Sequence, residues 1–169
     1  MKIEKIDFQD EDFRRLIKKY CLNSLPFSEI EEASSLSSRT AATEKYIKNT
    51  LTKSDVSICA RSNRGEYLFF TFFKKGENRL NLSFAFPNQE LKQTISEMRV
   101  CFYKLCLKAI KKTKIEKITG SIRRKNKKRA YEICLKRYGK AITYVENEGK
   151  GFDNVYLTKE SILKHYEEL

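Results

Sequence analysis

The sequence predicts an α+β fold, with a mixed, mostly antiparallel central sheet of about six or seven strands flanked by helices. Two observations support this fold class. Apolar residues recur with a helical period near both ends and with a strand period in the middle of the chain. The chain has 169 residues, of which 40% are hydrophobic, which suffices for one core and one domain over residues 1–169.

The N-terminal third predicts an edge strand and two helices. Residues 2–8 place apolar side chains among charges, as in a short edge strand. The acidic turn 9–12 suits the start of a helix, and the apolar spacing that follows predicts that helix over about 11–22. A Ser-rich loop is expected through Ser38, and a second helix over about 39–52.

The middle of the chain predicts a three-stranded antiparallel meander over 55–86. Residues 56–60 form the first strand, and residues 67–73 are apolar throughout, as in a strand covered on both faces. The third strand has a clean period of two, with large apolar side chains at Leu80, Leu82, Phe84 and Phe86.

The C-terminal half begins with a long amphipathic helix, expected from Glu90 to about Thr113. The elements expected after it are a strand over 115–122, a helix over about 126–138 that ends at Gly139, strands over 141–145 and 154–157, and a helix from about Lys159.

The positive charge is concentrated in one part of the chain. Residues 104–140 contain fifteen Lys and Arg and two acids, so their charge (15 − 2 = +13) equals the net charge of the whole chain. Such a concentration favours a surface that binds a polyanion such as nucleic acid. The candidate residues are Lys104, Lys108 and Lys111 on the long helix, and Arg123, Arg124, Lys125, Asn126, Lys127, Lys128 and Arg129 at the start of the next helix.

Cations at a helix start oppose the helix dipole and cost roughly 0.3–1 kcal/mol each, which a docked anion would offset. Two interpretations of this basic segment stay open from its charge: a solvated surface, and a site for nucleic acid or another extended polyanion. Base-specific recognition is not expected, because no nucleic-acid-reading motif occurs.

The order of the expected elements resembles the GNAT superfamily of N-acetyltransferases over nearly the whole chain. Strand 115–122, followed by Asn126, a helix and Gly139, is similar to the family's fifth strand and the helix after it. The resemblance implies a GNAT-like fold with acetyl-CoA as cofactor. The chain also resembles, weakly, GNAT-like phage internal virion proteins, which implies a viral or mobile-element origin and a place in the host cytoplasm or the virion.

One family feature is absent. Active members have a glycine-rich turn before the long helix, whose backbone N–H groups hold the pyrophosphate of acyl-CoA. Residues 86–93 occupy this place, and no glycine occurs between Gly76 and Gly120. Glu90 adds a negative charge there. The resemblance therefore implies a degenerate acyl-CoA site, and no cofactor is assigned unless the protein is active, in which case it is acetyl-CoA. The resemblance also leaves open a third interpretation of the basic segment, as a replacement site for the phosphates of CoA, and it implies one continuous basic patch with the long helix.

The family's catalytic groups are also missing from their usual positions. Where members often have a glutamate base on the fourth strand, this chain has Asn81 and Ser83, with Glu77 in the preceding turn. The position of the family's tyrosine acid holds Leu135. Tyr131 and Tyr138 bracket that position and are catalytic candidates if the protein is active.

The five cysteines include no CxxC pair, and His165 is the single histidine. This composition fits a reduced cytoplasmic protein with buried thiols and predicts no metal site. The apolar runs are too short to cross a bilayer, and the chain starts without a secretory signal, so no membrane partner is expected.

These observations predict a GNAT-like protein with a degenerate acyl-CoA site that acts as a non-catalytic binding or structural module, contacting a polyanion through its basic face. A protein partner is also open. The competing hypothesis is an active acetyl-CoA-dependent N-acetyltransferase with a non-standard CoA-binding loop. A third hypothesis is an acetyltransferase that acts on charged RNA.

Overall fold

The computed structural model describes residues 1–24, 35–123, 132, 134–136, 138–147 and 151–167. Among these residues, seven strands form one sheet in the order β1-β2-β3-β4-β5-β7-β6. The strands are β1 (Lys2–Lys5), β2 (Val56–Arg61), β3 (Tyr67–Lys75), β4 (Leu80–Pro87), β5 (Lys117–Arg123), β6 (Thr143–Val145) and β7 (Phe152–Thr158). Neighbouring strands are antiparallel except β4 and β5, which are parallel. The predicted fold class is confirmed.

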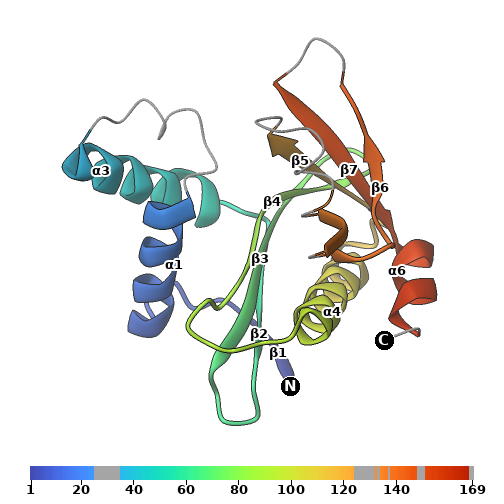
Figure 1. Ribbon diagram of the computed structural model, residues 1–169, viewed down its shortest axis with the longest axis horizontal. Helices are drawn as coiled ribbons and strands as arrows, with labels where there is room; N and C mark the ends of the chain where they lie inside the picture. The colour runs from blue at the N-terminus through green and yellow to red at the C-terminus, as the bar shows by residue number, and fades with distance from the viewer. Residues whose placement is uncertain (25–34, 124–131, 133, 137, 148–150, 168–169) are drawn as a thin grey trace.

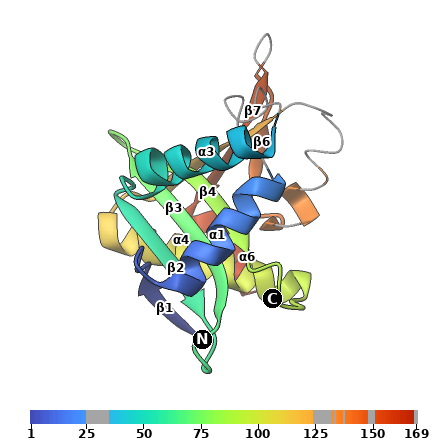
Figure 2. The same ribbon diagram turned by 90° about the vertical axis from the view of Figure 1, so that its left-hand side faces the viewer.

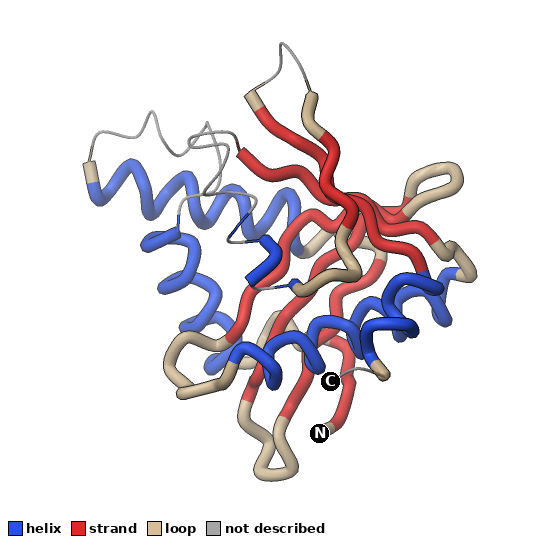
Figure 3. The backbone as a smooth tube through the Cα atoms, turned by 45° about the vertical axis from the view of Figure 1, so that its right-hand side comes forward, coloured by secondary structure: helices blue, strands red, loops and turns tan. Residues whose placement is uncertain are grey.

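Helices cover both faces of the sheet. They are α1 (Glu11–Ser24), α3 (Leu36–Tyr46), which continues into the π-helical turn η1 (Ile47–Leu51), α4 (Ile95–Thr113) and α6 (Lys159–Tyr166). Helices α1 and α3 lie on one face, and α4 and α6 on the other (Figure 1). Figure 2 looks onto the face that α1 and α3 cross, and Figure 3 shows the strands between the two helical layers.

Strand β3 separates two hydrophobic cores. Phe70 and Phe72 pack with α1, whereas Phe69 and Phe73 pack with α4, and all four are buried. Burying an aromatic side chain contributes roughly 1.5–3 kcal/mol. The prediction that residues 67–73 form a strand covered on both faces is therefore confirmed.

Two predicted helix starts are wrong, and in both cases a capping residue explains the difference. Helix α3 begins at Leu36 rather than near 39, because the Ser35 hydroxyl accepts a hydrogen bond from the backbone N–H of Ser38. Helix α4 begins at Ile95 rather than at Glu90, because Thr94 and Glu97 form a capping box.

The predicted uniform alternation along β4 is also wrong. Phe72 pairs with Phe84 and Phe73 pairs with Leu82, so Ser83 is an extra residue in β4. A bulge of one residue inverts the side-chain alternation beyond it. Leu80 and Leu82 consequently pack in the core under α4, whereas Phe84 and Phe86 pack in the core under α1.

The remaining elements of the C-terminal half agree with prediction apart from their ends. Strand β5 begins at Lys117, and the last two strands and α6 lie where they were expected. Of the helix predicted over 126–138, the described residues Glu132, 134–136 and Tyr138 are helical, and the rest lie outside the described residues. Gly139 has a φ of +77°, and its N–H donates to the Leu135 carbonyl, as expected for the end of a helix.

Candidate functional site

The two parallel strands in the middle of the sheet part from each other. In the described chain their pairing consists of Leu80 with Ile118 and Asn81 with Thr119. The Thr119 hydroxyl donates to Oδ1 of Asn81 over 2.9 Å at the last of these pairs. Beyond this point β4 stays paired with β3 and β5 stays paired with β7. Figure 1 shows the two strands diverging from the end at which they pair.

The bulge at Ser83 lies where the divergence begins. A bulge increases local twist and bends its strand, and the pairing of β4 with β5 ends at Asn81, two residues before the bulge. β4 carries no carboxylate, and Glu77 is exposed in the turn at the opposite, paired end of the strand. Asn81 holds Thr119. The described residues of β4 therefore place no general base beside the gap in pairing.

The turn 88–94, between β4 and α4, is fastened to β3 by two amide side chains. The Asn88 amide is buried and donates to the Tyr67 carbonyl over 2.9 Å. The Gln93 amide donates to the Leu68 carbonyl, also over 2.9 Å. These two residues fix the path of the turn without glycine.

Most backbone N–H groups of this turn are used inside the chain. Those of Asn88, Leu91 and Gln93 donate to the carbonyls of Leu68, Asn88 and Leu91, respectively. The N–H of Glu90 donates to the Asn88 side chain over 3.0 Å. Each N–H group bonded in this way is unavailable to an incoming phosphate.

Two carboxylates, those of Glu90 and Glu97, lie in the turn 88–94 and in the first turn of α4. Glu97 accepts from the backbone N–H of Thr94, its capping-box partner, and this bond lowers the pKa of the Glu97 carboxyl. Glu90 accepts from Arg15 at 2.7 Å and from Lys19 at 3.0 Å, and these two cations of α1 lower its pKa. Both carboxylates are therefore ionised near neutral pH, and Glu90 joins the turn to α1.

Of the two candidate catalytic tyrosines, the structure describes only Tyr138. Tyr131 lies outside the described residues. Tyr138 is half-buried, its ring centroid lies 4.6 Å from that of Phe102, and its carbonyl accepts from the Tyr103 hydroxyl over 2.6 Å. Leu135, at the expected position of the acid, accepts through its carbonyl from Arg99.

The candidate basic residues that the structure describes lie on α4 and at the end of β5. Residues 124–129 are outside the described residues, and Arg123 is the last residue of β5. Lys104, Lys108 and Lys111 lie on α4, which ends shortly before the start of β5. Lys104 lies over the ring of Tyr166, with its Nζ 5.9 Å from the ring centroid. Arg123 and the end of α4 are thus separated by the length of β5, roughly 20 Å.

The thiols are inert groups of the two cores. All five cysteines are free and buried. Burial raises the pKa of Cys21 to about 12 and that of Cys59 and Cys101 to about 11. Nδ1 of His165 lies 2.8 Å from the Ser161 carbonyl oxygen. Within the described residues, no cluster of His, Cys, Asp or Glu has the make-up of a metal site, and no helix could cross a membrane.

No protein-family model and no curated protein matches the sequence. Solved structures do match. The PaiA N-acetyltransferase of Thermoplasma acidophilum, in complex with coenzyme A, superposes with a TM-score of 0.60 at 17% identity, over 94% of this chain and 99% of that one. The spermidine N-acetyltransferase of Vibrio cholerae, in complex with CoA and spermine, has a TM-score of 0.59 at 12% identity, over 96% of this chain and 97% of that one. A GNAT-family acetyltransferase of Bacillus anthracis has a TM-score of 0.51 at 15% identity, over 94% of each chain.

The chain has a GNAT-like fold. At these identities the likeness concerns the fold alone. The sequence resemblance to this fold is therefore confirmed. The Thr94–Glu97 capping box was missed, although the spacing Thr-x-x-Glu before an apolar run is its usual signal. The Glu90 contact with α1 has no local signal, since the two residues it joins are 75 positions apart.

Proposed function

We propose that this GNAT-like protein is a binding module whose acyl-CoA site is degenerate, and that it contacts a polyanion through the basic segment that begins at Arg123. The observation that supports this most directly is the hydrogen bonding and charge of the turn 88–94 and of the start of α4. The N–H groups of this turn bond mainly within the chain, Glu97 places a carboxylate on the first turn of α4, and Glu90 engages Arg15 and Lys19 in ion pairs. A pyrophosphate there would meet the Glu97 carboxylate and few free donors.

The concentration of charge supports the second half of the proposal. The basic segment begins at the end of β5, on the side at which β4 and β5 part. Six cations in seven residues provide the repeated phosphate contacts that make backbone binding strong and salt-dependent. The proposed ligand class is nucleic acid, bound through its phosphates.

Acetyl-CoA binding tests the degenerate site. Under the proposal, excess acetyl-CoA leaves the melting temperature unchanged and gives no saturable heat in calorimetry. A ligand at ~100 times its dissociation constant would add about 2.7 kcal/mol and raise the melting temperature by about 5–10 °C. Such a rise in the wild-type protein would overturn this half of the proposal.

Nucleic-acid binding tests the other half. Fluorescence anisotropy with a labelled single-stranded RNA should show binding that weakens steeply with salt. Reversing the charge of Arg123, Arg124, Lys127 and Lys128 should weaken it at least about tenfold and flatten the salt dependence. Unchanged binding in this variant would show that the basic segment is ordinary solvated surface.

The second candidate function is an active acetyl-CoA-dependent N-acyltransferase with a non-standard CoA grip. The observation that favours it is the gap between β4 and β5 beyond Asn81 and Thr119, in a chain whose fold matches structures that were solved with CoA. In this case acetyl-CoA binds, and reversal of Arg123 and Arg124 abolishes the binding, because those cations replace the turn as the phosphate site. Release of CoA thiol in the presence of spermine, the ligand of one neighbour, is the corresponding activity assay.

A further inference from the structure

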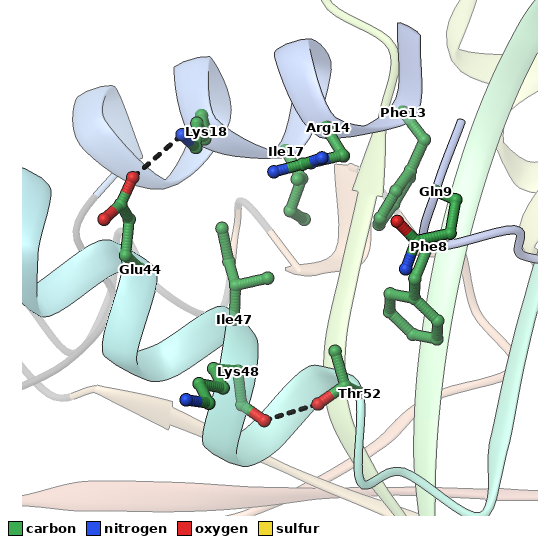
Figure 4. Close-up of a pocket in the computed structure, with 10 residues that line it drawn as sticks. All are labelled: Phe8, Gln9, Phe13, Arg14, Ile17, Lys18, Glu44, Ile47, Lys48 and Thr52. Carbon is green, nitrogen blue, oxygen red and sulfur yellow. Dashed lines mark hydrogen bonds and ion pairs between the residues drawn. The ribbon is translucent and has the colours of Figure 1, made fainter. Parts of the chain in front are cut away.

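A hollow of about 360 Å³ lies between the first half of α1 and the segment where α3 passes into η1 (Figure 4). No residue of β4, β5 or the turn 88–94 lines it. This α1–η1 pocket is therefore separate from the gap between β4 and β5, and a ligand held in it would bind independently of the proposed function.

The floor of the α1–η1 pocket is apolar. Phe8 and Phe13 meet edge to face, with ring centroids 5.6 Å apart. Ile17 from α1 and Ile47 from η1 point toward each other across the gap between the helices (Figure 4). Phe13 and Ile17 are buried, whereas Phe8 and Ile47 remain half-exposed. The pocket thus presents apolar surface on which a ligand gains affinity by burial.

The rim of the pocket carries a positive charge. Arg14, Lys18 and Lys48 line it together with one carboxylate, Glu44, which gives 3 − 1 = +2. Lys18 pairs with Glu44 at 2.8 Å. Neither Arg14 nor Lys48 has an ion-pair partner among the described residues. Arg14 and Lys48 are therefore available to attract an anion at the edge of the apolar surface.

The backbone of η1 is a second, independent feature. The N–H of Thr52 donates to the Ile47 carbonyl over 3.1 Å, five residues back, which closes a π-helical turn. Such turns are rare and often occur at functional sites, because they redirect side chains relative to the preceding helix. Here the turn brings Ile47, Lys48 and Thr52 to the same pocket.

We propose that the α1–η1 pocket binds a small amphipathic monoanion of the medium-chain acyl carboxylate class. The acyl chain lies on Phe8 and Ile47, and the carboxylate stays at the rim, where the positive charge of Arg14 and Lys48 attracts it from the two helices. The pocket volume falls at the lower end of the ~300–1,000 Å³ usual for small-ligand sites. The apolar floor disfavours a nucleic acid, and the net positive rim disfavours a polyamine.

Decanoate and decanol are the probes, since they share a chain and differ in charge. Isothermal titration of the full chain should show saturable decanoate binding, with decanol at least about tenfold weaker. Binding should also raise the melting temperature. The double variant Arg14→Gln and Lys48→Gln should bind decanoate about tenfold or more weakly, with decanol binding unchanged. The control variant is Lys45→Gln. Lys45 lies on α3, three residues before Lys48, but does not line the pocket, so this variant should bind decanoate as the wild type does.

Each other outcome overturns the proposal. Absence of saturable decanoate binding removes the site, and equal binding of decanol removes the role of the cations. Unchanged decanoate binding in the double variant places the ligand elsewhere. The unliganded melting temperature and circular dichroism of each variant verify that it is folded. Ile47→Gln offers a second test, since loss of floor surface should weaken both probes alike.

Discussion

Among the glycines that the structure describes, Gly139 has the closest contact at the position of an added Cβ. Its φ is +77°, and a Cβ placed there would lie 2.5 Å from the Tyr103 hydroxyl oxygen. That hydroxyl donates to the Tyr138 carbonyl, so it is fixed in place. Gly139 therefore combines a left-handed backbone with a close packing contact.

Gly139→Ala should lower the free energy of unfolding by about 2–4 kcal/mol, from backbone strain and overpacking together. Gly65→Ala is the matched control, because Gly65 has a φ of +85° and open space around its Cβ position. It should lose about 1 kcal/mol. Urea denaturation measures both. Equal losses would mean that the Tyr103 contact is unimportant, and Tyr103→Phe should recover part of the Gly139→Ala loss.

Asp10 joins three elements through one carboxylate. Its Oδ1 accepts from the backbone N–H groups of Asp12 and Phe13 at the start of α1, and its Oδ2 accepts from Tyr67 at 2.7 Å and Arg61 at 2.8 Å. The hydrogen bond from Tyr67 and the contact with Arg61 lower the pKa of Asp10 below its ordinary value of about 3.8.

Because the folded-state pKa of Asp10 is the lower one, its contribution to stability is complete above about pH 4 and is lost as the pH falls through the folded value. Asp10→Asn should reduce the melting temperature near neutral pH and show a smaller further fall toward pH ~3 than the wild type. Asp10→Ala should lose about 1 kcal/mol more, because it also removes the helix cap. Parallel melting curves for Asp10→Asn and wild type over this pH range would refute the assignment.

At the scale of elements, the bulge in β4 decides which core each half of the strand joins. Without Ser83, Phe84 and Phe86 would turn toward α4 and leave the aromatic cluster with Tyr20, whose ring centroid lies 4.3 Å from that of Phe86. Burial of these rings is worth several kcal/mol. The bulge also accompanies the parting of β4 from β5.

Deletion of Ser83 should therefore abolish cooperative unfolding or prevent folding, whereas Ser83→Ala, which keeps the chain length, should change stability by less than about 0.5 kcal/mol. Near-ultraviolet circular dichroism and urea titration compare the two variants. A deletion variant as stable as the wild type would mean that β4 tolerates either register.

At the scale of the whole molecule, the basic residues of 104–140 are spread over several elements, with Lys104, Lys108 and Lys111 on α4 and Arg123 at the end of β5. Three residues separate the end of α4 from the start of β5, and the basic segment begins at the end of β5. The length of β5, roughly 20 Å, exceeds the ~8 Å Debye length at physiological salt, so we expect the cations of α4 and those of the basic segment to act on a short ligand nearly independently.

With a short oligonucleotide, reversal of Lys104, Lys108 and Lys111 should reduce the salt slope of binding by less than about one. Reversal of Arg123, Arg124, Lys127 and Lys128 should reduce it by about three. Anisotropy titrations at several salt concentrations measure both slopes. Equal reductions would point to a single patch that spans both ends of β5.

The sequence by itself determined the kind and order of the elements, the two-sided burial of β3, the position of Gly139 and the missing glycine turn. These depend on residues close together in the chain, whose periodicity and backbone freedom act locally. The sequence also contains the capping residues Ser35 and Thr94, so the true starts of α3 and α4 could have been predicted from it.

The tertiary structure alone decided which strands pair, where β4 and β5 part, that Ser83 is an extra residue, and that Glu90 contacts Arg15. It also decided that Arg14 and Lys48 border one apolar pocket. Each of these joins residues far apart in the chain, and the choice among possible pairings comes from packing two cores at once on the two faces of one sheet. Local sequence patterns do not report which pairing packs both cores best. The alternation of apolar side chains along β4 could therefore be recognised, whereas its inversion at the Ser83 bulge could not.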